Sequence, residues 1–108
     1  MNRISVMHHG EYNGMWFDAD KAEEFQEETY WNGNNYISKA TGSQREHEKL
    51  YFTKSGKWIL HSWSDWQGRR ASTELISLEE AVRWFARNEY KDEDIPKFIL
   101  KELENYEL

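Results

Sequence analysis

The sequence predicts one α+β domain, in which an antiparallel meander of three or four strands carries helices mainly on one face. Three observations predict this fold. Segments 46–53 and 57–66 have the composition of a hairpin, segment 72–76 follows as a third strand, and an amphipathic helix comes directly after it. The length of 108 residues suits one domain, and 16% aromatic residues can build its core although aliphatic residues are few.

Extended chain and a short helix are expected before the hairpin. Residues 4–7 are predicted as a strand and residues 12–17 as extended chain. Asp20 and Glu23 have the spacing of a capping box, which predicts a helix over 21–29.

The predicted helix is followed by a turn and a further strand. The run Asn32-Gly33-Asn34-Asn35 is expected to end the helix, because Gly and Asn tolerate the left-handed conformation. Residues 36–40 are then predicted as a strand, and Thr41-Gly42-Ser43 as the turn that leads into the hairpin.

The register of the hairpin decides which side chains are buried. A turn with Gly56 in the left-handed bulge position places Phe52 opposite Trp58 and gathers four apolar side chains on one face. These are Leu50, Phe52, Trp58 and Leu60. A two-residue turn at Ser55-Gly56 would scatter the apolar side chains over both faces, so we favour the bulge. The opposite face then carries His47, Lys49, Tyr51, Lys57, Ile59, His61, Trp63 and Asp65.

Two helices are predicted in the last third of the chain. Ser77 and Glu80 have capping-box spacing, which predicts a helix over 78–87 that ends at Asn88. Segment 94–96 is expected to start a last helix, because Pro is favoured in a first turn.

Trp84 lies off the apolar stripe of the helix predicted over 78–87. Together with Arg83 and Arg87 it could line a partner surface, or it could pack against a neighbouring helix.

The net charge of −6 is unevenly distributed. Residues 1–38 hold two basic and seven acidic groups, residues 39–70 hold seven basic and three acidic groups, and residues 71–108 hold five basic and ten acidic groups. Either the acidic arms neutralise the basic middle, or the middle binds an anionic partner. The whole chain is too acidic for a protein that coats DNA.

Several classes of protein and site are excluded by composition. No cysteine is present, which rules out disulfide frameworks, thiolate nucleophiles and zinc sites with cysteine ligands. No apolar run approaches the roughly 20 residues of a membrane span, and residues 1–10 lack the apolar stretch of a signal peptide. Adjacent His8 and His9 would point to opposite faces of a strand, and no phosphate loop or nucleophile elbow is present. We expect no cofactor and no metal.

His47 and His61 are the candidate catalytic residues. In the bulged register they lie diagonally on one face, close enough to share a ligand or a phosphate. Cleavage of a phosphodiester would need such an acid–base pair and a cation, for which Lys49 or Lys57 is available. The alternative is that His61 is a half-buried hydrogen-bonding residue and that His47 is solvated.

The segment from Trp63 to Arg70 is the most unusual part of the sequence. Its two tryptophans, Trp63 and Trp66, are three residues apart and point to opposite faces of a strand, and two arginines follow. Aromatic side chains beside cations suit stacking or an interface hot spot. Alternatively, both tryptophans are in the core and the arginines pair with acidic helices. The predicted binding residues are Lys49, Tyr51, Trp63, Trp66, Arg69 and Arg70.

Two runs of sequence resemble small bacterial proteins of uncharacterised function. They are LYFTKSGKWILHSWSDWQG, residues 50–68, and ISLEEAVRWFARN, residues 76–88. The similarity covers about residues 15–90 and implies a prokaryotic, cytoplasmic setting. It implies no activity, ligand or catalytic residue.

Three functions are compatible with these patterns. The first is a non-enzymatic binding or regulatory module that acts through protein contacts, such as a phage or mobile-element inhibitor of the anti-CRISPR or antitoxin type. The second is a nucleic-acid-binding module that uses the basic aromatic hairpin face. The third is a small hydrolase or nuclease built on His47 and His61. We expect an unidentified protein as the partner, with nucleic acid as the alternative; a membrane partner is not expected, and a homo-oligomer stays possible.

Overall fold

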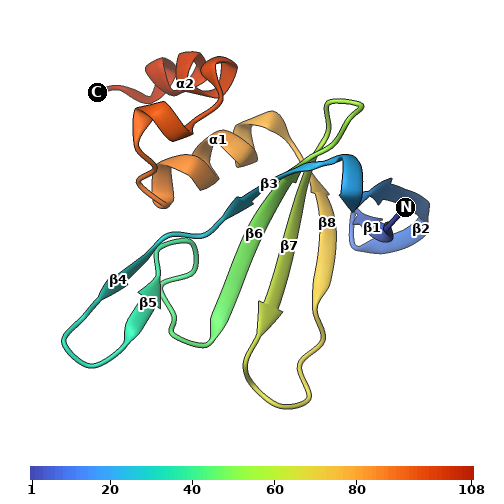
Figure 1. The fold of residues 1–108 in the computed structure, drawn as a ribbon, viewed down its shortest axis with the longest axis horizontal. Helices are drawn as coiled ribbons and strands as arrows, with labels where there is room; N and C mark the ends of the chain where they lie inside the picture. The colour runs from blue at the N-terminus through green and yellow to red at the C-terminus, as the bar shows by residue number, and fades with distance from the viewer.

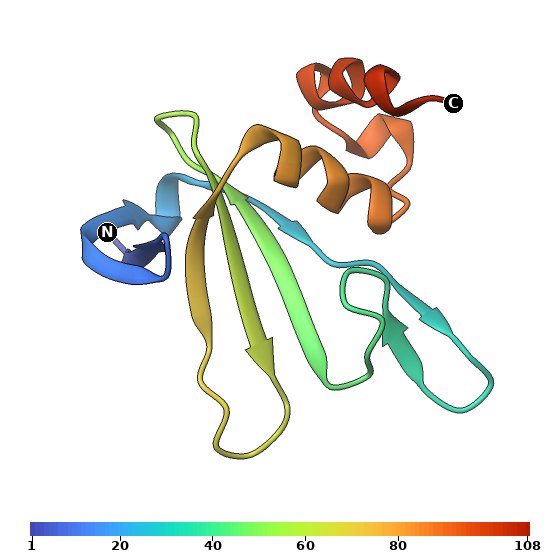
Figure 2. The ribbon, with the colours of Figure 1, turned by 180° about the vertical axis from the view of Figure 1, so that it is seen from behind.

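A twisted sheet of six strands forms the centre of the fold, and both α-helices pack against one of its faces (Figures 1 and 2). The structure is a computed structural model that describes residues 1–108. The strand order is β2-β1-β8-β7-β6-β3. The six strands are β1 (Arg3–His8), β2 (Glu11–Asp18), β3 (Glu23–Gln26), β6 (Glu46–Phe52), β7 (Trp58–Ser64) and β8 (Ser72–Ile76).

The remaining elements are short. A separate two-stranded sheet consists of β4 (Thr29–Trp31) and β5 (Tyr36–Ser38). The helices are α1 (Leu78–Arg87) and α2 (Lys97–Leu103), with single 3-10 turns at η1 (Ala19–Lys21), η2 (Asp92–Asp94) and η3 (Glu104–Tyr106). None of the helices combines the length and the apolar character needed to cross a bilayer.

The α+β class is confirmed, but the prediction of three or four antiparallel strands is wrong. The meander β6-β7-β8 is extended on one side by β3 and on the other by the β1–β2 hairpin. The pair formed by β1 and β8 is parallel, while the other pairs of this sheet are antiparallel. Strands that join a sheet from distant parts of the chain leave no local turn signal, which is why the sequence pattern indicated only the meander.

The predicted helix over 21–29 is also wrong. Asp18, rather than Asp20, caps the short turn η1, and the chain then becomes extended as β3. Phe25 lies opposite Leu50 and is buried in the main core. The alternation of an inward Phe25 between two polar neighbours fits an edge strand, and this tertiary contact outweighs the local helix propensity.

The hairpin of β6 and β7 has the predicted register. Phe52 pairs with Trp58 and Leu50 pairs with Leu60. Gly56 has a φ of +85°, as the bulged turn requires. The side chains of this face enter a core that also contains α1 and α2.

The Gly56 conformation leads to a first prediction about stability. A Cβ atom at Gly56 would meet no atom within 4 Å, so a substitution there acts only through the backbone. We expect Gly56→Val to destabilise the protein more than Gly56→Asn, because Asn tolerates positive φ and a β-branched residue does not. Urea denaturation of the two variants measures the difference, and equal midpoints would contradict it.

Helix α1 begins and ends at the predicted residues. The Ser77 Oγ accepts a hydrogen bond from the Glu80 backbone N–H at 3.1 Å, and the Ser77 N–H donates to the Glu80 carboxylate at 3.4 Å. Asn88 is the C-cap. The helix packs Ala81, Val82, Trp84 and Phe85 into the core.

The contribution of the capping box to the stability of the protein can be measured. We expect Ser77→Ala to destabilise the protein by about 1 kcal/mol, since the Glu80 N–H loses its partner at the start of the helix. Thermal and urea denaturation provide the measurement. Ser5→Ala is the control for removing a serine hydroxyl, because Ser5 is exposed on β1 and its hydroxyl makes no hydrogen bond within the protein. An unchanged midpoint in Ser77→Ala would show that the box contributes nothing.

Trp84 is part of the core and not of a partner surface. Its side chain is 1% exposed, and its indole N–H donates to the Glu48 carboxylate at 3.1 Å. Arg87 also approaches Glu48, at 3.9 Å. Trp84 is therefore a packed residue, and its side chain contacts Glu48 of β6 and the rings of Phe85 and Tyr90 rather than a neighbouring helix.

Candidate functional site

The sheet face opposite the helices is divided into a covered half and an open half. Near the β6–β7 turn, Tyr51 and Ile59 pack against Val6 and Phe17 of the β1–β2 hairpin. Tyr51 is only 6% exposed, so this predicted binding residue lies beneath the hairpin. The open half carries four side chains that are each partly exposed: His47, Lys49, His61 and Trp63.

Trp63 lies between the two histidines. Its ring centroid is 5.5 Å from that of His47 and 5.6 Å from that of His61, and both pairs are stacked within 30° of parallel. Trp63 is on the face predicted for it, away from Trp58, but it is half-buried and not fully exposed.

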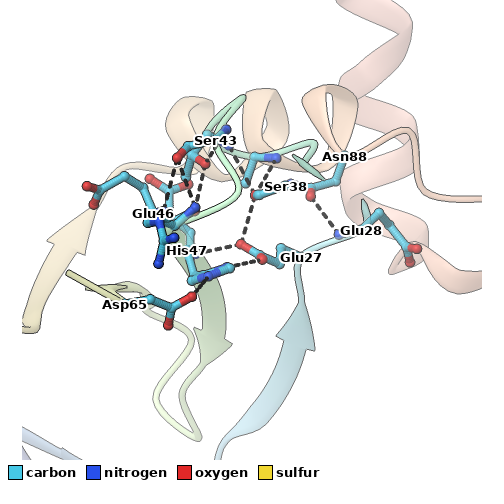
Figure 3. A network of polar contacts seen from close by, with 12 residues as sticks. Glu27, Glu28, Ser38, Ser43, Glu46, His47, Asp65 and Asn88 are labelled. Carbon is cyan, nitrogen blue, oxygen red and sulfur yellow. Dashed lines mark hydrogen bonds and ion pairs between the residues drawn. The ribbon is translucent and has the colours of Figure 1, made fainter. Parts of the chain in front are cut away.

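His47 is held by two carboxylates (Figure 3). Its Nδ1 is 2.7 Å from a Glu27 oxygen and its Nε2 is 2.8 Å from an Asp65 oxygen. Partial burial disfavours the charged ring, but the contacts with Glu27 and Asp65 outweigh it and raise the pKa of His47 above its ordinary value. The protonated ring can donate to both carboxylates at once.

Glu27 is the fixed member of this network. Its other oxygen accepts hydrogen bonds from the Ser38 hydroxyl at 2.8 Å and from the Glu48 backbone N–H at 2.7 Å (Figure 3). The next residue, Glu28, donates its N–H to the Asn88 side chain at 2.9 Å. These contacts fasten the base of the β4–β5 hairpin to β6 and to the end of α1.

His61 and Lys49 have different surroundings. The His61 Nδ1 is 2.9 Å from the Thr73 hydroxyl, and burial together with nearby Lys49 lowers the pKa of His61. The Lys49 ammonium pairs with Glu24 at 2.9 Å. Burial opposes the charge of Lys49, but Glu24 prevails and the pKa of Lys49 is raised. This predicted binding cation is therefore largely neutralised.

The candidate acid–base pair is not arranged around a cleft. Both ring nitrogens of His47 contact carboxylates, and the Trp63 ring contacts both histidines. Neither histidine lines any of the four surface pockets. A phosphodiester would have to displace Asp65 to reach the His47 Nε2.

A second surface is formed where β7 ends. Trp66 is 53% exposed, and the Arg45 guanidinium lies 4.7 Å from its ring centroid. Arg69 pairs with Glu46 at 3.5 Å, on the sheet and not on a helix. Arg70 is exposed and makes no ion pair. Of the predicted binding residues, Trp66, Arg69 and Arg70 thus lie together on loop 65–71.

The β4–β5 hairpin extends this surface with aromatic side chains that the sequence interpretation missed. Trp31 is 57% and Tyr36 67% exposed, and their rings meet edge to face at 5.1 Å. Tyr36 and Arg45 line the same hollow of about 240 Å³. The residues Trp31, Tyr36, Arg45 and Trp66 therefore form a continuous series, which we name the aromatic row.

The aromatic row belongs to one end of the molecule. In both ribbon views, the turn of the β4–β5 hairpin and loop 65–71 flank the start of β6, far from the β6–β7 turn (Figures 1 and 2). No family model matches this chain, and neither do any of the curated proteins or solved structures compared with it. The chemistry of the row is thus what indicates a function.

The charges around the row are mainly positive. Segments 29–45 and 65–71 contain one acidic residue, Asp65, and four basic residues. The basic residues are Lys39, Arg45, Arg69 and Arg70. Lys39 pairs with Glu89 at 3.4 Å and Arg69 with Glu46, which leaves Arg45 and Arg70 without a carboxylate partner. Segment 29–38, which forms the β4–β5 hairpin, carries no charged side chain at all. A signal for this site was present in the sequence, since three aromatic residues flank a polar Asn/Gly turn there.

Proposed function

We propose that this protein is a non-enzymatic binding module, and that the aromatic row contacts a partner protein. The observation that carries the proposal is the continuity of Trp31, Tyr36, Arg45 and Trp66 across three separate segments. Tryptophan, tyrosine and arginine are the residues enriched at interface hot spots. The row is also held in place, because hydrogen bonds of Glu27 and Glu28 fix the base of the β4–β5 hairpin to β6 and to the end of α1.

The partner surface is acidic under this proposal. Segments 29–45 and 65–71, which form the row, carry a net positive charge in a protein whose total charge is −6. The guanidinium groups of Arg45 and Arg70 have no carboxylate partner within the protein, and guanidinium groups bind carboxylates in a bidentate geometry. Three arginines are few for binding the phosphate backbone of a nucleic acid, which favours a protein.

The kind of binding protein that we propose is inferred from the size and the net charge of the chain. Inhibitors of the anti-CRISPR or antitoxin type are small acidic proteins that act by covering a partner, and we propose this class for the protein. The cytoplasm is the proposed location, supported by the resemblance to small bacterial proteins and by the lack of cysteine.

Affinity capture from the host, with and without nuclease, tests the proposal. The variant Trp31→Ala/Trp66→Ala removes two exposed aromatic side chains of the row, and Tyr12→Ala/Tyr106→Ala removes two exposed ones elsewhere. We expect the row variant to lose the captured protein, with affinity reduced about 30-fold or more, and the control to retain it. Nuclease should leave the capture unchanged.

Two results would overturn the proposal. Release of the captured material by nuclease, with a steep dependence of affinity on salt, would indicate a nucleic-acid partner. Equal capture by the two aromatic variants would show that the partner binds elsewhere. Circular dichroism of both variants verifies that they are folded.

A further inference from the structure

A pocket of about 540 Å³ lies between β2 and the β6–β7 turn, at the end of the molecule away from the aromatic row. Its volume is in the range of small-molecule sites, which is about 300–1,000 Å³. The apolar side chains that line it come from both the hairpin and the sheet: Val6, Met15, Trp16, Phe17, Ile59 and Leu75. All of them except the exposed Trp16 belong to, or pack against, the second core cluster.

The charged residues that line this pocket are mainly cationic, and Gly14, Thr53 and Ser55 complete the lining. Lys21, Lys54 and Lys57 line it, and the only carboxylate among the lining residues is that of Asp18. Asp18 is already engaged, because one oxygen accepts the backbone N–H groups of Asn2 and Asp20 and the other reaches Lys21 at 4.0 Å. Lys54 and Lys57 make no ion pair. The pocket therefore combines an apolar wall with two uncompensated positive charges, in a protein of net charge −6.

We propose that this pocket binds a single-chain amphiphile with an anionic head, such as a medium-chain carboxylate. The chain packs against the accessible side chains of Met15, Trp16 and Leu75, which lie over the buried Phe17 and Ile59, and the head lies between the ammonium groups of Lys54 and Lys57. A bare inorganic anion would leave the apolar wall unused, and a neutral lipid would leave both lysines without a partner. The site is independent of the proposed protein-binding row.

Calorimetric titration with ligands that differ only in the head group tests this inference. The ligands are decanoate, decyl phosphate, decanol and decyltrimethylammonium, each below its micelle concentration. We expect saturable binding of the two anions, weaker binding of decanol and none of the cation. Because each buried methylene strengthens binding by about fourfold, octanoate should bind more weakly than decanoate. The ratio of the decanoate and decyl phosphate affinities identifies the preferred head.

Two lysine pairs provide the matched control. Lys54→Gln/Lys57→Gln should weaken decanoate about tenfold and leave decanol unchanged, whereas Lys97→Gln/Lys101→Gln on α2 makes the same charge change away from the pocket. Methyl NMR signals of Ile59 and Leu75 should shift on binding, and those of Ile95 and Ile99 in the helix-side core should not. Equal loss in the two lysine variants, or shifts confined to the helix-side core, would overturn the assignment. Failure to bind free decanoate together with binding to vesicles of anionic lipid would overturn it too, in favour of a membrane surface.

Discussion

Replacing Trp58 by alanine is expected to destabilise the protein by about 3–5 kcal/mol, the usual cost of truncating a buried aromatic residue. Trp58 is 4% exposed, and its ring packs against Phe25, Phe52 and Phe85. Trp63→Ala should cost about 2 kcal/mol or less, because the Trp63 ring is half-buried and stacks only on the two histidines. Urea denaturation of both variants gives the two free energies of unfolding.

The pair of tryptophan variants tests which face of the hairpin is the core face. Both residues are on β7, and the hairpin register places them on opposite faces of the sheet. If Trp63→Ala unfolds the protein as readily as Trp58→Ala, the open half of the sheet is ordinary core. A role of Trp63 in binding would then have to be given up.

The second large effect concerns His47 and the pH dependence of stability. The pKa of His47 is raised in the folded protein above the ordinary value of 6.5, so between these two values the native state keeps a proton that the unfolded state has lost. The stabilisation by Glu27 and Asp65 is therefore complete below pH 6.5 and is lost as the pH rises through the folded pKa. Denaturation measured from pH 5 to pH 9 should show this decrease.

The variant His47→Gln isolates the contribution of this histidine. We expect it to lose about 1–3 kcal/mol at pH 6, because the largely buried Glu27 carboxylate loses its cationic partner. The decrease in stability above pH 6.5 should disappear in the same variant. A decrease that persists would assign the titration to another group.

The titration of His61 changes the stability of the protein with pH in the direction opposite to that of His47. Burial and Lys49 lower the pKa of His61 below 6.5, so the folded protein holds the neutral ring where the unfolded chain is already protonated. The stabilisation from neutral His61 is present above pH 6.5 and is lost as the pH falls through the folded pKa. In His47→Gln the remaining profile should therefore rise with pH across the range in which His61 titrates.

Local physical chemistry was sufficient to predict the second half of the fold. Gly56 defined the register of β6 and β7 because only one turn geometry gathers the apolar residues. Ser77 and Glu80 defined the start of α1 through contacts between neighbours in sequence. The structure of the region before β6 was harder to predict from the sequence, because Phe25 is buried by Leu50 and Phe85, which come much later in the chain. No window around residues 21–29 contains that information.

The candidate site was predictable only in part. Trp66, Arg69 and Arg70 lie on an exposed loop, as the composition of that segment indicated. Tyr51 is buried because the β1–β2 hairpin folds over it, a contact that strand alternation cannot show. The helix predicted over 21–29 hides the strand that begins at Thr29, so the sequence does not show that Trp31 pairs with Tyr36 and that the two rings form one surface.

The parallel pairing of β1 with β8 separates the order of synthesis from the order of folding. Met7 lies opposite Glu74, so the β1–β2 hairpin is synthesised well before β8, the strand with which it pairs. An isolated two-stranded hairpin is marginally stable in water, and contacts across long stretches of chain form slowly. We expect β6, β7, β8 and α1 to assemble first through their short connections. Tyr51 and Ile59 then stay exposed to chaperones until the β1–β2 hairpin packs over them.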